Sequence, residues 1–144
     1  MANIFDAANY ILEKKGKMST MKLQKLCYYA QAWSLVWDDE ELFDEEFEAW
    51  ANGPVCPALF HAHKGKYAIS SIPEENLSRK GLNCAQKDSI DTVLEYYGDR
   101  NAQWLSTLTH MELPWKKARK GIADGMPSSK IIKKSSMAEY YGSL

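Results

Sequence analysis

One pair of side chains in this sequence has the residue types of acid–base chemistry. His110 stands two positions before Glu112, and a histidine can act as a general base when a second group lies within hydrogen-bond reach. Neighbouring positions on a helix do not face each other, so a hydrogen-bonded structural histidine beside Thr109 is the interpretation that we favour. We therefore expect no enzymatic activity, and a small hydrolase centred on His110 is kept as an alternative.

A second group, Cys56, His61 and His63, invites a metal-site interpretation. On a helix, positions two apart diverge by about 200°, so the two histidines would not share a face, and zinc sites use other spacings. A fourth ligand is not apparent. The sequence also contains no Gly-rich phosphate loop and no nucleophile elbow. We expect neither a metal ion nor a cofactor.

The composition is that of an ordinary globular chain. It has 144 residues, 45% of them hydrophobic, and a net charge of −1, which favours a single domain over residues 1–144 and gives no reason to expect an acidic membrane or nucleic acid as a partner. No apolar run reaches the roughly 20 residues of a membrane span, and the first residues lack the pattern of a secretory signal. Three widely spaced cysteines fit a reducing compartment, so we expect a cytoplasmic protein.

Hydrophobic periodicity predicts a mainly α-helical, compact domain around a central buried helix, with a short strand or hairpin. A first helix follows the N-cap Asn3 and ends at Gly16. The central helix runs from near Ser19 to about Trp37 and is apolar on most sides, which is typical of a helix with neighbours all around it. Further helices are predicted at residues 56–66, 83–97, 104–110, 115–120 and 137–141.

Local signals place the remaining elements. Alternating apolar residues predict a strand at residues 47–51, closed by a turn at Asn52-Gly53-Pro54, and residues 68–72 are its candidate partner. Ser136 and Glu139 have the spacing of a capping box, so the last helix is expected to begin at Met137.

The charged residues are distributed unevenly. Residues 38–48 carry eight acidic side chains in eleven positions, whereas residues 115–134 are strongly basic. These segments could pair with each other within the fold or steer a charged partner. A DNA-binding regulator that uses the basic C-terminal third is a second alternative. No helix-turn-helix or ribonucleoprotein motif supports it, so we do not expect nucleic acid as a partner.

Three stretches, in this order and at this spacing, resemble the Panacea (SocA-like) antitoxin family, whose members are often described as phage-associated proteins. They are Lys22-Leu23-Gln24-Lys25-Leu26-Cys27-Tyr28-Tyr29-Ala30-Gln31-Ala32-Trp33, then residues 42–50 followed by Gly53-Pro54-Val55, and finally Leu108-Thr109-His110 with Pro114-Trp115 and Ala118-Arg119. The resemblance covers residues 3–141.

The resemblance implies a cytoplasmic bacterial antitoxin, usually encoded beside its toxin in prophages and other mobile elements, which neutralises the toxin by direct contact. In the SocA branch the antitoxin is also an adaptor that delivers its toxin to the ClpXP protease. Aromatic and arginine side chains are the usual anchors of such contacts. Residue type and motif position make Tyr29, Trp33, Trp50, Trp115 and Arg119 the candidate partner-binding residues. Trp115 is also expected to pack on the core, because it follows a helix end.

Overall fold

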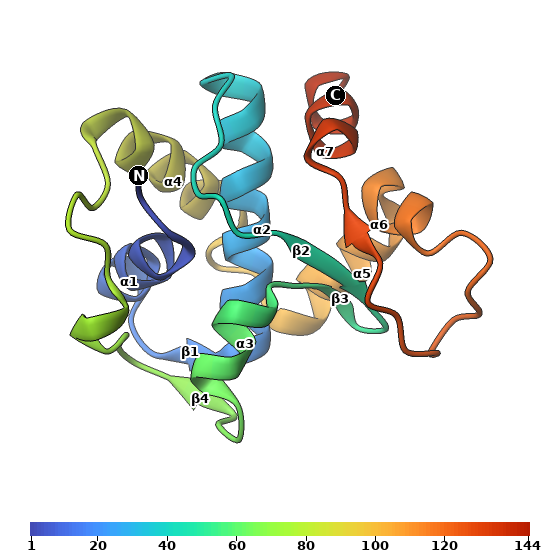
Figure 1. Cartoon of the computed structure of the whole chain (residues 1–144), viewed down its shortest axis with the longest axis horizontal. Helices are drawn as coiled ribbons and strands as arrows, with labels where there is room; N and C mark the ends of the chain where they lie inside the picture. The colour runs from blue at the N-terminus through green and yellow to red at the C-terminus, as the bar shows by residue number, and fades with distance from the viewer.

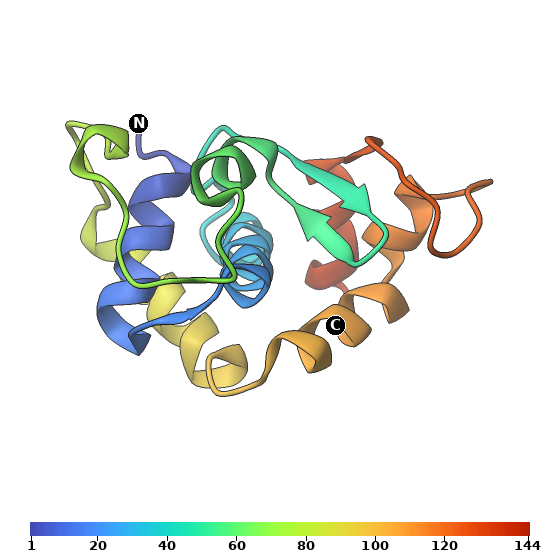
Figure 2. The same ribbon diagram turned by 90° about the horizontal axis from the view of Figure 1, so that it is seen from below.

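Helix α2 (Thr20–Trp37) forms the centre of the computed structural model, which describes all 144 residues, and the other helices pack around it (Figures 1 and 2). Every residue from Leu23 to Ala32 is buried, so the prediction of a central buried helix is confirmed. The helices that pack directly against it are α1 (Ile4–Lys15), α4 (Cys84–Tyr97), α5 (Ala102–Met111) and α7 (Lys134–Gly142). Helix α6 (Leu113–Ala118) packs against α5 and α7, α3 (Pro57–His63) follows the strands, and a short 3-10 helix η1 (Glu74–Asn76) lies between α3 and α4 in the chain.

Side-chain caps fix the starts of the main helices where the sequence predicts them. The side chain of Asn3 accepts a hydrogen bond from the Asp6 amide at 2.9 Å, and the Asp6 carboxylate accepts one from the Asn3 amide at 2.9 Å. The Ser19 hydroxyl caps α2 with a single hydrogen bond, which it accepts from the Lys22 amide at 3.1 Å. These bonds satisfy amide groups that have no partner inside the helix. The predicted starts of the first two helices are therefore confirmed.

The strands form two small sheets. β2 (Phe47–Trp50) and β3 (Gly53–Val55) form an antiparallel hairpin, and β5 (Ile131–Ile132) pairs with the other edge of β2. Gly53 and Pro54 belong to the returning strand rather than to the turn, which corrects the predicted turn at residues 52–54.

The second sheet pairs the segment before α2 with the segment after α3. β4 (Ala68–Ile69) pairs with β1 (Met18–Ser19), just before α2. The prediction that residues 68–72 pair with residues 47–51 was therefore wrong. The free edge of β2 is occupied instead by β5, and a pairing between segments so distant in sequence has no local signal.

Helix α7 begins earlier than predicted. Its first residue is Lys134 and its N-cap is Lys133, which makes no side-chain capping bond. The expected capping box of Ser136 and Glu139 was therefore wrong, because Ser136 lies inside the first turn. Packing of α7 against α2 decides where this helix starts, and such tertiary contacts override local capping preferences.

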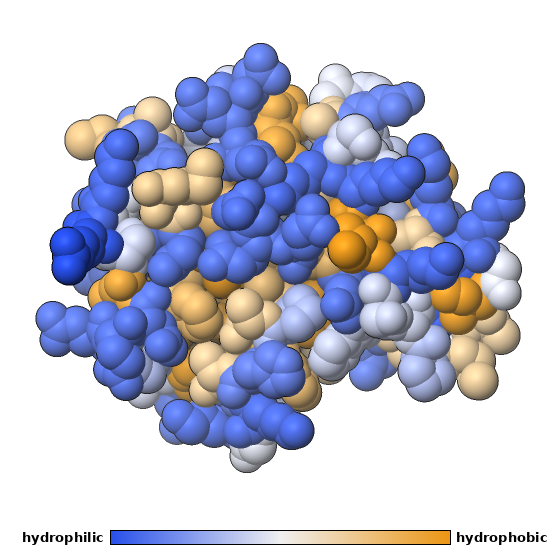
Figure 3. Space-filling view, viewed as in Figure 1, coloured by the Kyte–Doolittle hydropathy of each residue, from blue (hydrophilic) through white to orange (hydrophobic).

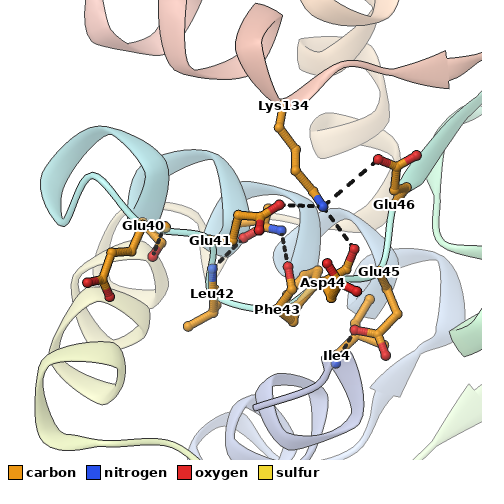
Figure 4. A network of polar contacts seen from close by, with 11 residues as sticks. Ile4, Glu40, Glu41, Leu42, Phe43, Asp44, Glu45, Glu46 and Lys134 are labelled. Carbon is orange, nitrogen blue, oxygen red and sulfur yellow. Dashed lines mark hydrogen bonds and ion pairs between the residues drawn. The ribbon is translucent and has the colours of Figure 1, made fainter. Parts of the chain in front are cut away.

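The acidic segment between α2 and β2 is tied into this packing (Figure 4). The ammonium group of Lys134 lies 2.6 Å from the Glu41 carboxylate and donates to the carbonyl of Asp44 at 2.8 Å. Gln31 on α2 holds the backbone of the same segment, since its amide donates to the Phe43 carbonyl and accepts from the Leu42 amide, both at 2.7 Å. One lysine of the basic third is thus paired within the fold.

None of the helices combines the length and apolarity that crossing a bilayer requires.

Candidate functional site

The three sequence stretches converge on the β2–β3 hairpin. Four buried or partly buried side chains each donate a hydrogen bond to a backbone carbonyl of the hairpin or its turn. They come from α2, α5, α6 and the residue that caps the C-terminus of α6. The pairs are Arg119 Nη1 with Ala49 O at 2.9 Å, Trp115 Nε1 with Trp50 O at 2.9 Å, the Ser106 hydroxyl with Asn52 O, and Lys25 Nζ with Pro54 O at 3.1 Å. The hairpin is therefore held through its backbone, by helices that lie behind it.

Gln24 fixes the chain where β3 leads into α3. Its side-chain oxygen accepts from the Cys56 amide at 2.8 Å, and its nitrogen donates to the Cys56 carbonyl at 3.2 Å. The same nitrogen lies 3.1 Å from Nε2 of His63. Burial lowers the pKa of His63, which favours the neutral ring that can accept this hydrogen bond.

The predicted group of possible metal ligands is divided by the structure. His63 is buried and contacts Gln24, whereas His61 is exposed and makes no hydrogen bond. The amide and carbonyl of Cys56 are both taken by Gln24. No three histidine, cysteine or acidic side chains lie together in an arrangement that could hold a metal ion.

Lys25 is fully buried at the back of the hairpin. Besides Pro54, its ammonium group contacts only the sulfur of Met21, at 3.6 Å, and it forms no ion pair. Burial therefore lowers the pKa of Lys25 to about 7. Gly53 leaves the space for this side chain: a Cβ at that position would lie 2.6 Å from Lys25 Cε, and the backbone there has a φ of +118°.

A second polar cluster locks α2, α7 and the start of α6 together. The Glu112 carboxylate accepts from the hydroxyls of Tyr29 at 2.6 Å and Tyr141 at 2.7 Å, and the Tyr28 and Tyr141 hydroxyls are 3.2 Å apart. Burial raises the pKa of Glu112, although both tyrosine hydrogen bonds oppose this change. Tyr29 is also stacked on Tyr97, with ring centroids 4.2 Å apart.

His110 does not form an acid–base pair with Glu112. Its ring stacks on Trp115 with centroids 4.0 Å apart, and Nε2 is buried without a hydrogen-bond partner. Burial lowers the pKa of His110, and the positive charges of Lys25 and Arg119 lower it further. The Glu112 carboxylate is occupied by two tyrosines. The positioned second group that general-base chemistry needs is therefore missing beside this histidine.

The five predicted partner-binding residues have different surroundings. Tyr29, Trp115 and Arg119 are at most 6% exposed and have internal hydrogen-bond partners. Trp33 and Trp50 are half-buried: the Trp33 indole donates to the Tyr97 hydroxyl at 3.0 Å, and Trp50 packs edge-on against Phe60. Only these two present a surface to solvent, and a role of any of the five in binding a partner stays a prediction.

A groove of about 770 Å³ lies beside the hairpin. It is bordered by the start of α2, the hairpin, α3 and the loop at residues 125–129. Its apolar lining consists of Met21, Trp50, Val55, Phe60 and Pro127 with Ala51, its polar lining includes Thr20, Gln24, Asn52, Ser128 and Ser129, and Glu48 is its acidic side chain. This volume is in the range of ligand-binding pockets. Elsewhere the molecule is mostly hydrophilic on the face seen in Figure 3, with separate apolar patches.

Sequence reasoning missed Gln24, Lys25 and Ser106 as the residues that position the hairpin. A signal for two of them was present. Gln24 and Lys25 lie on a helix that is apolar on most sides, and polar groups that such a helix buries must find partners inside the protein. Ser106 had no comparable signal, because the position of the hairpin over α5 depends on the tertiary fold.

The sequence model of the family described as "Antitoxin SocA-like, Panacea domain" matches residues 23–116. The chain belongs to this family. A relative, Antitoxin SocA of Caulobacter vibrioides (strain NA1000 / CB15N), is 33% identical over 125 residues, in a match that covers 75% of this chain and 65% of the relative. The chain thus spans a little under two thirds of that protein. No solved structure matches. The matched region of this Panacea domain contains the entire hairpin and three of the side chains that bind its carbonyls, namely Lys25, Ser106 and Trp115.

Proposed function

We propose that this Panacea domain is an antitoxin that neutralises a cognate protein toxin, encoded by an adjacent gene, by binding it directly. The observation that carries the proposal is the match to an antitoxin family across residues 23–116, the region that builds the hairpin and most of the groove. The absence of an assembled pair at His110 removes the specific reason to prefer a hydrolase.

The groove supplies a preformed contact surface. The hairpin backbone is fixed from behind by Arg119, Trp115 and Lys25, so a partner would not have to order it, and such preorganisation lowers the cost of binding. Trp50 and Phe60 stand together at this surface, and clustered aromatic side chains are frequent anchors of protein interfaces. A stable complex buries roughly 1,200–2,000 Å² in total, so the toxin would cover the groove and the surface around it.

Co-expression tests the proposal. Cells that express the product of the adjacent reading frame should survive only when this chain is present, and the two proteins should co-purify. Trp50→Ala should raise the dissociation rate and abolish rescue, because it removes an aromatic anchor. Trp104→Ala is the matched control, since Trp104 is 39% exposed on α5, outside the groove. Circular dichroism should show that both variants fold.

The outcome in protease-deficient cells separates two modes of neutralisation. If the chain occludes the toxin, rescue should persist in a host that lacks ClpXP. If the chain delivers the toxin to ClpXP, as the SocA branch implies, rescue should vanish in that host while binding in vitro is unchanged. Rescue by a folded chain that makes no contact with the toxin would exclude both modes.

A further inference from the structure

A small basic cleft lies between α6, β5 and α7. Its volume is about 210 Å³, enough for one or two side chains. Pro114, Ala118 and Ile131 provide an aliphatic lining, and Lys117, Lys130 and Lys133 provide the charge, with Ser136 beside them. The two lysines at positions 130 and 133 flank β5, whereas Lys117 comes from the last turn of α6.

These three lysines have no acidic partner within the protein. All three are exposed, none takes part in a salt bridge, and no carboxylate lines the cleft. The acidic segment pairs with Lys134 instead, through Glu41 and Glu46. Lys116 and Lys120, also exposed and without an ion pair, add further positive charge on and just after α6. The charge of the cleft is therefore available to a partner.

The cleft is held in a fixed geometry. Ile132 is 1% exposed and pairs with Phe47, and the Lys130 carbonyl accepts from the Ala49 amide at 2.8 Å. Pro114 is buried on the opposite wall. The lysine side chains are exposed, and their backbone attachment points are set by the core. A preformed basic cleft of this kind favours electrostatic complementarity with a negatively charged partner.

We infer that this cleft binds an acidic segment of the cognate toxin, with an aspartate or glutamate side chain of the toxin seated between Lys117, Lys130 and Lys133. The inference rests on the proposed antitoxin function and names the chemistry that the partner must carry. The aliphatic lining accommodates the methylene groups of a glutamate, and the lysines meet its carboxylate. The loop at residues 125–129 borders the groove and leads directly into Lys130, so one partner can contact both sites.

A protein segment fits this site better than nucleic acid. A duplex needs a track of basic residues along several phosphates, whereas this cleft is short and has an aliphatic lining. The acidic segment around Glu41 and Glu46 is tied to Lys134, immediately after Lys133. It would repel any anionic chain that extended from the cleft in that direction, so the partner must present its negative charge at the cleft itself.

Three probes test the inference with the full chain: the product of the adjacent reading frame, poly-L-glutamate and a 20-base-pair DNA duplex. The cleft variant is Lys117→Gln, Lys130→Gln, Lys133→Gln. The control variant Lys17→Gln, Arg79→Gln, Lys80→Gln removes the same charge from exposed positions whose side chains form no salt bridge or hydrogen bond. These lie at the end of α1 and in the loop before α4, on the opposite side of the molecule from α6 and β5 (Figure 1).

We expect the cleft variant to bind the toxin and poly-L-glutamate roughly tenfold more weakly than the control does, with a shallower dependence on salt, because three charge contacts are lost. Equal toxin binding by both variants, with rescue intact, would overturn the cleft assignment and leave the antitoxin function standing. Absence of any toxin binding by the wild type would overturn the function instead. Tighter binding to the duplex than to poly-L-glutamate, lost in the cleft variant, would reassign the cleft to nucleic acid.

Discussion

The ammonium group of Lys25 donates a hydrogen bond of 3.1 Å to the carbonyl oxygen of Pro54, inside the protein and without a carboxylate beside it. A lysine in such surroundings loses its proton easily, because burial penalises the charged form. The pKa of Lys25 is about 7, against an ordinary value of 10.5. The protonation state of one side chain is thus coupled to the strand that borders the groove.

Lys25→Met should remove a pH dependence of stability. Between pH of about 7 and 10.5 the unfolded chain holds a proton on Lys25 that the folded chain has released, so the wild type becomes more stable as the pH rises through this window. Methionine has no such proton. Urea unfolding at pH 7 and pH 9.5 should show a gain for the wild type and for the control Lys17→Met, and a clearly smaller gain for Lys25→Met. Equal gains in all three proteins would mean that Lys25 is charged in the folded state.

Gly53→Ala should destabilise the protein more than an ordinary glycine substitution does. The new methyl group would meet Lys25 Cε at 2.6 Å and Thr109 Oγ1 at 3.1 Å, at a φ of +118°. We expect a loss of about 2–4 kcal/mol in the free energy of unfolding. Gly65→Ala is the control, because Gly65 also has a positive φ, +86°, but nothing lies within 4 Å of its Cβ position. Its cost should be about 1 kcal/mol. Equal losses would show that backbone strain alone accounts for Gly53.

Trp115→Ala should cost about 3–5 kcal/mol in the free energy of unfolding, as for other large-to-small substitutions in a core. The indole is 6% exposed, stacks on His110 and donates to the Trp50 carbonyl. Thermal melting measures the loss, with Trp104→Ala, at 39% exposure, as the comparison. Trp115→Phe separates the two contributions, since it keeps most of the packing and loses the hydrogen bond. An unchanged melting temperature for Trp115→Ala would contradict the buried position of the ring.

Replacement of Glu112 by alanine should lower the free energy of unfolding strongly, whereas replacement by glutamine should lower it little. Glu112→Ala leaves the buried hydroxyls of Tyr29 and Tyr141 without their acceptor, at a cost of about 2–5 kcal/mol. Glutamine keeps an acceptor oxygen, and its cost should stay within about 1 kcal/mol. Because the pKa of Glu112 is raised in the folded state, the wild type should lose stability as the pH rises from about 4.5, and Glu112→Gln should lack this decline. Chemical unfolding of the three proteins between pH 4 and pH 7 checks both expectations.

The sequence predicts the helices well and the sheet pairings poorly, for identifiable reasons. Asn3 and Ser19 act within their own turn of chain, so their capping roles are visible locally. β5 has two residues and pairs with a strand more than 80 positions away, which leaves no periodic pattern to detect. The start of α7 was misplaced because Ser136 and Glu139 have the right spacing for a cap, while packing on α2 extends the helix past them.

The candidate site was predictable in part. The three motif stretches do meet in space, but most of their distinctive side chains face inward. Tyr29 and Arg119 were selected as anchors by residue type, and residue type does not reveal that their polar groups are taken by Glu112 and Ala49. Trp50 and the groove depend on α3 and on the loop at residues 125–129, which are separated in sequence and come together only in the fold.

The helices hold the hairpin by hydrogen bonds to its main chain and by the buried side chains of Phe47, Ala49 and Val55, and this separates two tasks that one peptide segment must usually share. The carbonyls of Ala49, Trp50, Asn52 and Pro54 carry the structural bonds, while the side chains of Glu48, Trp50 and Asn52 line the groove. Substitution of those side chains leaves the anchoring bonds in place. The groove-lining side chains of this segment can therefore vary independently of the bonds that attach it to the helices. With the toxin bound at the groove as proposed, a library randomised at residues 48, 50 and 52 should yield folded proteins with altered partner choice, and antitoxins for new toxins could be sought there without redesign of the helices.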